Sequence, residues 1–401
     1  MIVLSSIERS RPVRPFKNAT FLTLALCLLV PGTGRAADPI FDQSRLHECR
    51  LELDPADWSA LRANFQTNQY YAANLTVDGE TVKQVGIRSR GAGSRSGEKP
   101  GLKVDFNKYV SGQEFHGYKS VVLDNVTQDP SMMRELLANN VFESVGIPYP
   151  QIAFCRLSIN TDFWGLYTLI EAVSKPFLKA RLGEESGTLF DYEYVDDYRF
   201  TYKGDGLAPY SPSPFEPQTN ENKLDSGLGD FIRAINQTAQ SGYAAAMESY
   251  IDVKRFLTYV ATENACAEYD GLVGQFGMNN FYLYQYGSQK KFVFIPWDKD
   301  TSFQAADWPV QQRMDSNEFT KRLMLDPAMK AYYESEVKRV ATTLVTTEFL
   351  GPKIDQFANL IRASVSADTH KPFSVADFEA AVSGLKGIAA ARAGNVAAQV
   401  P

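Results

Sequence analysis

The chain has few histidines and lacks an excess of basic residues over acidic ones. Both features limit the classes of function that it can have. It holds three histidines, His47, His116 and His370, without clustered Cys/His spacing, which argues against a zinc site and against a hydrolase built on a histidine triad. The formal net charge is -6, whereas nucleic-acid binders usually carry a basic excess. We therefore expect neither a zinc enzyme nor a nucleic-acid-binding protein.

The apolar run near the N-terminus, residues 21–30, is short. A typical membrane-spanning helix needs about 20 apolar residues. Basic residues precede the run, and small residues at Gly34 and Ala36 follow it, an order typical of a secretory signal peptide cleaved between Ala36 and Ala37. A signal anchor is the alternative. We expect a secreted, periplasmic or cell-surface protein without a stable membrane span.

Cysteine is scarce as well. Beyond the predicted signal peptide the chain keeps Cys49, Cys155 and Cys266, an odd number that leaves at least one thiol unpaired within a monomer. With 401 residues the chain can bury a sizeable core without disulfides. Ordinary buried thiols are therefore the simplest interpretation, and the disulfide state stays open.

The predicted strands and helices are not distributed evenly along the chain. Strands with one helix come first and helices with one hairpin follow, which predicts an α+β fold in two lobes, not a regular βαβ alternation. The clearest helix has Asp129 as its N-cap, Pro130 in its first turn and Gly146 at its end. We expect a signal peptide at 1–36, a strand-rich lobe at 37–183, a loop or insertion at 184–227 and a mainly helical lobe at 228–401.

Four polar residues stand at positions that favour phosphoryl transfer. Lys103 lies within the alternating strand GLKVDF, and Asp270 and Asn280 flank a Gly-rich loop. Asp298 ends the apolar strand KKFVFIPWD, where a bound cation would offset its desolvation. A lysine neutralises nucleotide phosphates, Asp and Asn oxygens hold a divalent metal, and a second Asp orients the nucleophile. Each residue alone fits an ordinary solvated strand or loop position, and the order of all four favours the functional interpretation.

Several separated segments resemble the CotH kinase family, atypical protein kinases similar to spore coat protein H. These segments are DPSMMRELLANNVFESVGIPYPQ, FWGLYTLIEAVSKPFL, NNFYLY and FVFIPWDKDTSF. The resemblance implies a kinase-like fold with a mixed β N-lobe, a mainly helical C-lobe, and ATP with Mg²⁺ (or Mn²⁺) between them. It implies phosphate transfer to a Ser, Thr or Tyr hydroxyl of an exported or cell-surface protein.

The resemblance also implies roles for the four polar residues. Lys103 stands for the phosphate-binding strand lysine, and Asp270 for the aspartate that accepts the substrate proton. Asn280 and Asp298 stand for the two metal ligands. Asp270 and Asn280 are ten positions apart, whereas a typical kinase has about five, so either the loop is longer or the catalytic aspartate lies elsewhere.

Further residues are implied at the ATP site. Arg88 matches an arginine that contacts phosphate, and Glu135, in preference to Glu143, is the helix partner of Lys103. Glu171 begins the crossing between lobes, where backbone near Ala172 and Val173 would meet adenine. The glycine motif G-x-G-x-x-G is absent, and the stretch RGAGSRSG, residues 90–97, stands in its place.

Two other functions remain open. A signal peptide and the polar 184–227 range also suit a non-catalytic surface scaffold or adhesin with a kinase-like shell. Asp270 and Asp298, with nearby aromatic residues that could stack on sugars, match the two-carboxylate pattern of glycoside hydrolysis. These aromatic residues are Trp297, Phe303 and Trp308.

Overall fold

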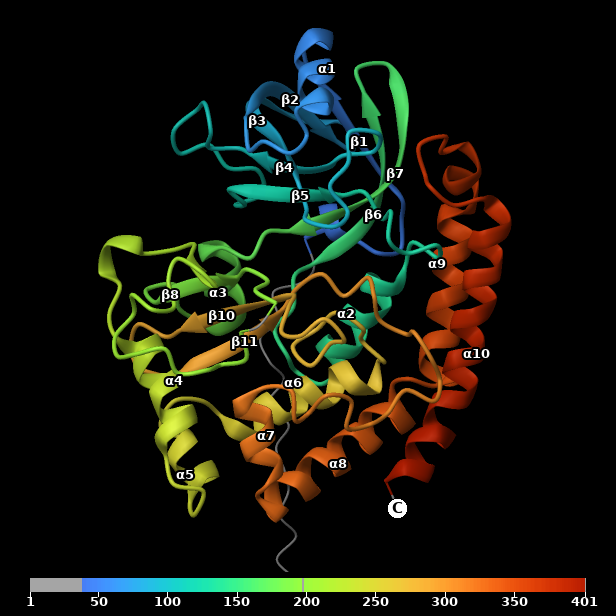
Figure 1. Ribbon diagram of the computed structural model, residues 1–401. Helices are drawn as coiled ribbons and strands as arrows, with labels where there is room; N and C mark the ends of the chain where they lie inside the picture. The colour runs from blue at the N-terminus through green and yellow to red at the C-terminus, as the bar shows by residue number, and fades with distance from the viewer. Residues whose placement is uncertain (1–37, 197, 401) are drawn as a thin grey trace, which may run out of the picture. The chain divides into compact units, whose positions relative to one another are not determined.

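Seven strands close into a barrel in the order β1-β2-β3-β4-β5-β7-β6 (Figure 1). The computed structural model describes residues 38–196 and 198–400, so the predicted signal peptide lies outside the described residues. The sequence predicts a strand-rich first part but not its closure, which parallel pairing of β1 with β6 completes. The barrel strands are β1 (His47–Glu52), β2 (Tyr71–Val77), β3 (Glu80–Arg90), β4 (Gly101–Asp105), β5 (Ser120–Asp124), β6 (Ile152–Ile159) and β7 (Asp162–Glu171).

Side chains of the barrel strands alternate between its interior and its outer surface. On β4, Leu102 and Val104 are completely buried in the barrel core, whereas Lys103 lies between them on the outer face and is half-buried. On β5 the outward-facing Val122 belongs to the second, larger core of the protein. The outer face of β4 and β5 is thus turned toward the rest of the chain, which confirms the predicted direction of Lys103.

A second sheet has four strands in the order β11-β10-β8-β9. It pairs the expected hairpin, β10 (Phe281–Gln285) and β11 (Phe292–Pro296), with β8 (Thr188–Tyr192) and β9 (Phe215–Pro217). The range 184–227, expected to be a loop or small insertion, therefore supplies two strands. The Gly- and Pro-rich composition of this range gives no clear strand pattern, and both strands are short. β8 is fixed by pairing with β10 and by aromatic packing such as Tyr192 on Phe281 at 4.6 Å, and β9 is fixed by pairing with β8.

The helix after β5 begins later than the sequence predicts. α2 spans Arg134–Ser144, and the carboxylate of Asp129 accepts N–H bonds from Ser131, Met133 and Arg134, each at 2.8 Å. Asp129 therefore lies in a separate turn before α2 and is not the first residue of the helix. Met132, in the same turn, has a positive φ of 57°, which an α-helix does not allow. The end of α2 is as expected, with Gly146 in the left-handed region.

The chain after β11 is mainly helical, as predicted. α8 packs against α6 and α10, and α10 lies beside α9, which contacts β7 (Figure 1). No described helix is both long and apolar enough to cross a membrane. The helices are α1 (Pro55–Ala63), α2, α3 (Lys175–Leu182), α4 (Gly227–Gln237), α5 (Tyr243–Met247), α6 (Val253–Ala265), α7 (Glu318–Met324), α8 (Pro327–Thr343), α9 (Thr347–Ala367) and α10 (Val375–Gln399), with short 3-10 turns at Pro39–Phe41 and Glu221–Lys223.

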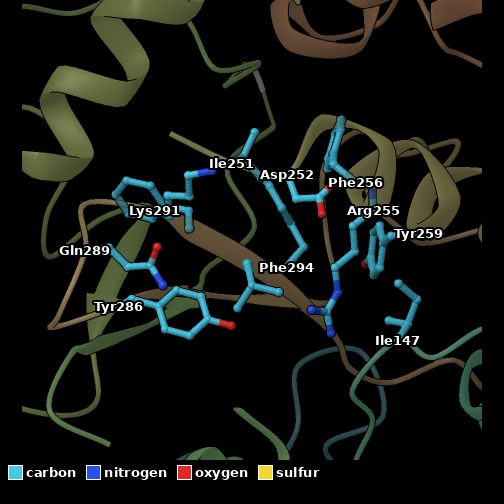
Figure 2. Close-up of a pocket in the computed structure, with 12 residues that line it drawn as sticks. Ile147, Ile251, Asp252, Arg255, Phe256, Tyr259, Tyr286, Gln289, Lys291 and Phe294 are labelled. Atoms are coloured by element: carbon cyan, nitrogen blue, oxygen red, sulfur yellow. Dashed lines mark hydrogen bonds between the residues drawn. The ribbon is translucent and has the colours of Figure 1, made fainter. Parts of the chain in front are cut away.

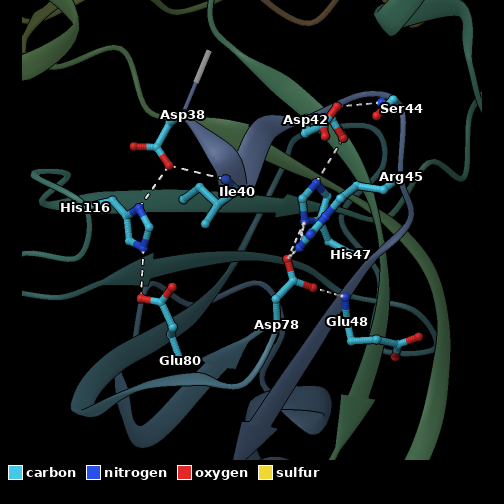
Figure 3. A network of polar contacts seen from close by, with 10 residues as sticks. All are labelled: Asp38, Ile40, Asp42, Ser44, Arg45, His47, Glu48, Asp78, Glu80 and His116. Atoms are coloured by element: carbon cyan, nitrogen blue, oxygen red, sulfur yellow. Dashed lines mark hydrogen bonds and ion pairs between the residues drawn. The ribbon is translucent and has the colours of Figure 1, made fainter. Parts of the chain in front are cut away.

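Two histidines fasten the start of the described chain to the barrel (Figure 3). His116 bridges the carboxylates of Asp38 and Glu80 at 2.9 and 3.1 Å. The ring of His47 lies 2.7 Å from the carboxylate of Asp78 and 3.0 Å from a backbone carbonyl. The third histidine, His370, stacks on Trp164 at 4.1 Å. All three histidines therefore contact other side chains of the described chain.

Cys49, Cys155 and Cys266 are all buried free thiols. Cys49 and Cys155 lie on neighbouring strands, but Cys155 is in register with His47 and not with Cys49. The two thiols are nevertheless neighbours, because burial and a hydrogen bond with the Cys49 side chain raise the pKa of Cys155, and both are free. The simplest interpretation from the sequence is confirmed.

Candidate active site

Asp270 opens a Gly-rich loop that folds back on itself. The backbone C=O of Gly271 accepts hydrogen bonds from Gly274 N–H at 3.0 Å and from Asn279 N–H at 3.2 Å. The chain thus returns after eight residues to the point where it left. This return brings Asp270 and Asn280 together although they are ten positions apart in sequence.

Two asparagines orient the carboxylate of Asp270. Asn279 Nδ2 donates to both carboxylate oxygens, at 3.1 and 3.0 Å. Asn280 Nδ2 donates to the backbone C=O of Asp270 at 3.0 Å and to its carboxylate at 3.2 Å. Burial raises the pKa of Asp270, and the hydrogen bond from Asn279 opposes that rise. With its Nδ2 used in this way, Asn280 keeps its side-chain oxygen for another ligand.

Asp298 lies beside Asn280 because β10 and β11 are paired. Trp297 N–H donates to the C=O of Asn280 at 3.2 Å, which places the next residue, Asp298, at the same edge. Both Asn280 and Asp298 have positive φ values, 56° and 52°, a conformation that Asn and Asp adopt more readily than most residues. Burial and the nearby charge of Asp124 raise the pKa of Asp298 to about 6.

A buried lysine holds this loop pair together, and the sequence interpretation missed it. Lys299 is fully buried, and its Nζ lies 2.9 Å from a carboxylate oxygen of Glu263 and 2.9 Å from the C=O of Asn280. Glu268, also buried, accepts the N–H of Asp270 at 2.9 Å. A Cβ on Gly271 would come within 2.6 Å of Glu263, so the loop needs glycine there. From the sequence, a lysine between two aspartates is expected to be exposed. The packing of the folded chain shows instead that Lys299 is buried and connects Glu263 to Asn280.

Negative charge accumulates around Asp298. Burial, followed by the charge of Asp298, raises the pKa values of Glu135 and Asp300 well above their ordinary range. Asp124 contributes to both shifts, and the nearby cations Arg90 and Lys299 act in the opposite direction on Glu135. Carboxylates forced together in this way favour a bound cation.

The donor set fits a divalent metal of the magnesium type. Asp298 and the side-chain oxygen of Asn280 are hard oxygen donors, and Mg²⁺ typically takes only one or two protein carboxylates and keeps waters or phosphate oxygens. Within residues 38–196 and 198–400, no group of three or more Asp, Glu, His or Cys side chains is arranged to hold a metal. A metal here would therefore depend on ligands from a bound phosphate.

Positive charge lies on the outer face of the barrel. Arg88 on β3 is directly opposite Lys103 on β4, an arrangement of like charges that is unfavourable without an anion. Arg88 donates to Tyr70 and Asn68 at 3.3 and 3.0 Å, and neither cation has an ion-pair partner among the described residues. Burial and the charge of Arg88 lower the pKa of Lys103. The pair is suited to bind phosphate.

Arg90 connects the two halves of the candidate site, and it too was missed. It lies 3.6 Å from the carboxylate of Asp124 and its guanidinium lies 5.4 Å from the ring centre of Trp297, next to Asp298. Arg88 and Arg90 are two residues apart on one strand and therefore share a face. That spacing in GIRSRG was the available signal.

The contacts of Glu135 and Glu171 in the structure differ from those expected from the sequence. Glu135 is buried, but no ion pair joins it or Glu143 to Lys103 among the described residues, and the cations that act on Glu135 are Arg90 and Lys299. The carboxylate of Glu171 is held by Gln151 N–H at 3.0 Å and Arg181 at 3.4 Å. The side chain of Glu171 thus fixes the β7 end, and Val173 packs in the core.

Comparisons with known proteins follow this geometry. A family model described as CotH kinase protein matches residues 87–396. Inner spore coat protein H of Bacillus subtilis is 26% identical over 350 residues, which cover 84% of this chain and 93% of that protein.

Two relatives come from Rhizopus delemar. Spore coat protein homolog 1 is 20% identical over 85% of this chain and 58% of its own length. Invasin CotH3 is 23% identical over 68% of this chain and 46% of its own length. The chain therefore spans about half the length of these two relatives.

Proposed function

The chain belongs to the CotH kinase family, and we propose that it is a metal-dependent protein kinase with a two-lobed, kinase-like fold. It transfers the γ-phosphate of ATP to a Ser, Thr or Tyr hydroxyl of an exported or cell-surface protein. The observation that carries the proposal is the convergence of Asp270, Asn280 and Asp298 at the ends of a single loop and hairpin. The barrel corresponds to the N-lobe and the helical part to the C-lobe.

Each side chain has a task in the transfer. Arg88 and Lys103 neutralise phosphate oxygens, and backbone near Val173 contacts adenine. Asp298 and Asn280 would hold Mg²⁺ or Mn²⁺, which would neutralise charge on the transferred phosphoryl group. The raised pKa values of Glu135, Asp298 and Asp300 support a cation at this point.

Asp270 serves as the proton acceptor. The acceptor hydroxyl oxygen bonds to the γ-phosphorus, the bond from that phosphorus to the bridging oxygen breaks, and ADP leaves. Asp270 receives the hydroxyl proton, held in place by the amides of Asn279 and Asn280. Burial raises the pKa of Asp270, which makes its carboxylate a better base.

The site of action is proposed from the relatives and the N-terminus. Two of the relatives are named as spore coat proteins and one as an invasin. Together with the predicted signal peptide, these names favour an exported or surface protein. They also keep a second candidate, a surface scaffold or adhesin in which the kinase-like shell has lost transfer.

Phosphate transfer tests the proposal directly. The purified protein is incubated with [γ-³²P]ATP, Mg²⁺ or Mn²⁺, and a panel of protein acceptors. We expect labelling by the wild type and a loss of about 100-fold or more in Asp298→Asn, because metal binding supplies several kcal/mol at the transition state. Asn accepts the same positive φ, so the variant keeps the backbone.

Asp315→Asn is the matched control, since Asp315 is exposed and lies outside the candidate site. It should label as the wild type does. Equal labelling by Asp298→Asn and the wild type contradicts the proposal. A ligand stabilises the folded state that binds it. If neither the wild type nor Asp298→Asn transfers phosphate, and Mg-ATP does not raise the melting temperature of the wild type, the results favour the surface scaffold or adhesin.

A further inference from the structure

A pocket of about 220 Å³ opens at the beginning of β11, away from the residues assigned above (Figure 2). Its walls come from the start of β11, the N-terminal turn of α6, the turn between β10 and β11, and Ile147 after α2. Lys103, Asp270, Asn280 and Asp298 do not line it. The pocket therefore needs an explanation of its own.

β11 is an edge strand, and this gives the pocket backbone donors and acceptors. The second sheet ends at β11, and Phe292 N–H donates outward to the C=O of Tyr250 at 2.7 Å. Phe294, two residues further on, faces the same edge because hydrogen-bonding directions alternate along an antiparallel strand. Its N–H and C=O have no hydrogen-bond partner assigned beyond the sheet in the described part of the chain. A ligand in the pocket can bind these groups.

The polar side chains of the pocket are mostly hydrogen-bond donors. Arg255 donates from Nη2 to the C=O of Gly146 at 3.4 Å. Lys291 and Tyr286 are cross-strand neighbours, joined by a backbone bond of 2.9 Å. Figure 2 shows the Arg255 guanidinium and the Tyr286 hydroxyl on one side of the β11 ribbon. Burial raises the pKa of Tyr286, with the charge of Arg255 opposing it, so the phenol keeps its proton and can donate at neutral pH.

Arg255 and Lys291 are the two cations of the pocket. No carboxylate of residues 38–196 and 198–400 lies within ion-pair distance of Arg255 or Lys291. Asp252, the acidic residue of the lining, uses its carboxylate to accept the N–H of Arg255 at 2.9 Å and so caps α6. The side chains Arg255, Lys291 and Asp252 together carry a charge of about +1 at neutral pH. This balance suits a ligand with one negative charge.

The remainder of the lining is apolar and favours a carbon body on the ligand. Ile147, Ile251 and Phe256 contribute buried side chains, as do Tyr259 and Phe294. The volume is below the range of about 300–1,000 Å³ that is usual for drug-sized ligands. We propose that this pocket binds a small organic monocarboxylate, with its carboxylate on Arg255 and Tyr286 and its apolar part against Ile147 and Phe256.

Two elements, β11 and α6, connect the pocket to the candidate active site. β11 begins at the pocket and ends two residues before Asp298, and α6 begins there and ends five residues before Asp270. The ligand would thus contact the far ends of both elements that carry the proposed catalytic groups. The binding proposal itself does not depend on phosphate transfer, and its test measures binding alone.

4-Bromobenzoate is the probe, and 4-bromobenzamide is its uncharged counterpart. We expect saturable binding of the carboxylate by calorimetry, with the amide at least about tenfold weaker because a guanidinium–carboxylate contact contributes about 1.4 kcal/mol or more. Arg255→Gln should weaken the carboxylate by a similar factor. A crystal soaked with the probe should show bromine anomalous signal beside Ile147 and Phe256, at the end of the ligand opposite its carboxylate.

Neighbouring lysines supply matched controls. Lys254→Gln and Lys290→Gln remove exposed charges that do not line the pocket and should leave the affinity unchanged. If Arg255→Gln fails to fold, Lys291→Gln and Tyr286→Phe take its place and should each weaken binding. The proposal is overturned by equal affinity for carboxylate and amide, by equal losses in the controls, or by bromine signal elsewhere. Binding seen only at crystal concentration, with none in solution up to about 10 mM, also overturns it.

Discussion

At Asp191 on β8, burial raises the pKa of a half-buried carboxyl to about 7, and the charges of Glu216 and Glu193 add to the rise while Arg90 opposes it. The folded protein therefore holds a proton that the unfolded chain releases near pH 4. Its ionised form is disfavoured by folding, so this residue lowers stability as the pH rises from about 4 to 7, and the penalty is complete above that range.

Asp191→Asn should accordingly stabilise the protein at pH 8 and leave it unchanged at pH 4. The expected gain in the free energy of unfolding is about 1–3 kcal/mol, since each unit of pKa corresponds to about 1.4 kcal/mol and the residue is only partly buried. Urea denaturation at both pH values measures it. Asp196→Asn, an exposed carboxyl five residues along, is the control and should change stability by less than about 0.5 kcal/mol. A pH-independent gain in Asp191→Asn would show that charge is not its cause.

Residues at the ends of strands could be identified from the sequence, whereas their buried supports could not. Asp270, Asn280 and Asp298 stand out as polar residues at the ends of elements: Asp270 follows a helix, Asn280 precedes a strand and Asp298 follows one. Lys299 is equally important to the geometry, yet its charge predicts exposure, and the structure buries it against Glu263. Local pattern shows where a strand ends, but the partner that permits burial comes from a distant part of the chain.

Among the elements, α10 acts on the candidate site through one buried cation. Arg392 is fully buried and donates to the carbonyls of Asn264 and Ala265, at 2.6 and 3.0 Å, at the last turn of α6. It also donates to the carbonyls of Ala306 and Trp308, at 3.0 and 2.6 Å. A cation at a helix C-terminus satisfies carbonyls that the helix leaves unpaired. Arg392 thus fixes the place where α6 passes into the Asp270 loop.

Arg392→Met should destabilise the protein by about 3–5 kcal/mol, because four buried carbonyls lose their donor. Urea denaturation gives the total effect, and amide hydrogen exchange at residues 266–270 should quicken. Arg362→Met is the control: Arg362 is partly exposed and pairs with Glu379 on the surface, so its loss should cost less than about 1 kcal/mol. If both variants cost the same small amount, Arg392 does not hold this segment.

Element type was easier to predict than element boundaries. The periodic segments 152–159, 162–171 and 253–265 form the expected strands and helix, because apolar spacing is a local property. The start of α2 differs because Asp129 caps a turn that the sequence cannot distinguish from a first helical turn. Barrel closure and β8 depend on pairing between strands far apart in sequence, which no local pattern encodes.

On the scale of the whole described chain, the barrel core and the larger second core meet along the outer face of β5, β6 and β7. A buried ion pair crosses from the barrel to the end of α9. Lys99 Nζ lies 2.7 Å from the carboxylate of Asp368 and 2.9 Å from the C=O of Leu166 on β7. The same carboxylate accepts the N–H of Leu166 at 3.0 Å. Lys99 and Asp368 are each about 1% exposed, so both are removed from water.

Removing one member of such a pair strands the other charge in the interior. We expect Lys99→Met to lower the free energy of unfolding by about 3–5 kcal/mol, while Lys99→Met with Asp368→Leu costs less than the sum of the two single changes by about 1–3 kcal/mol. The exposed pair Lys386–Asp355 supplies the control cycle, with a coupling below about 1 kcal/mol. Urea denaturation of all the variants measures both cycles. Equal coupling in the two cycles would mean that burial adds nothing to the interaction of Lys99 with Asp368, and that apolar contacts such as Phe154 on Phe357 at 5.4 Å join the barrel to the helical part.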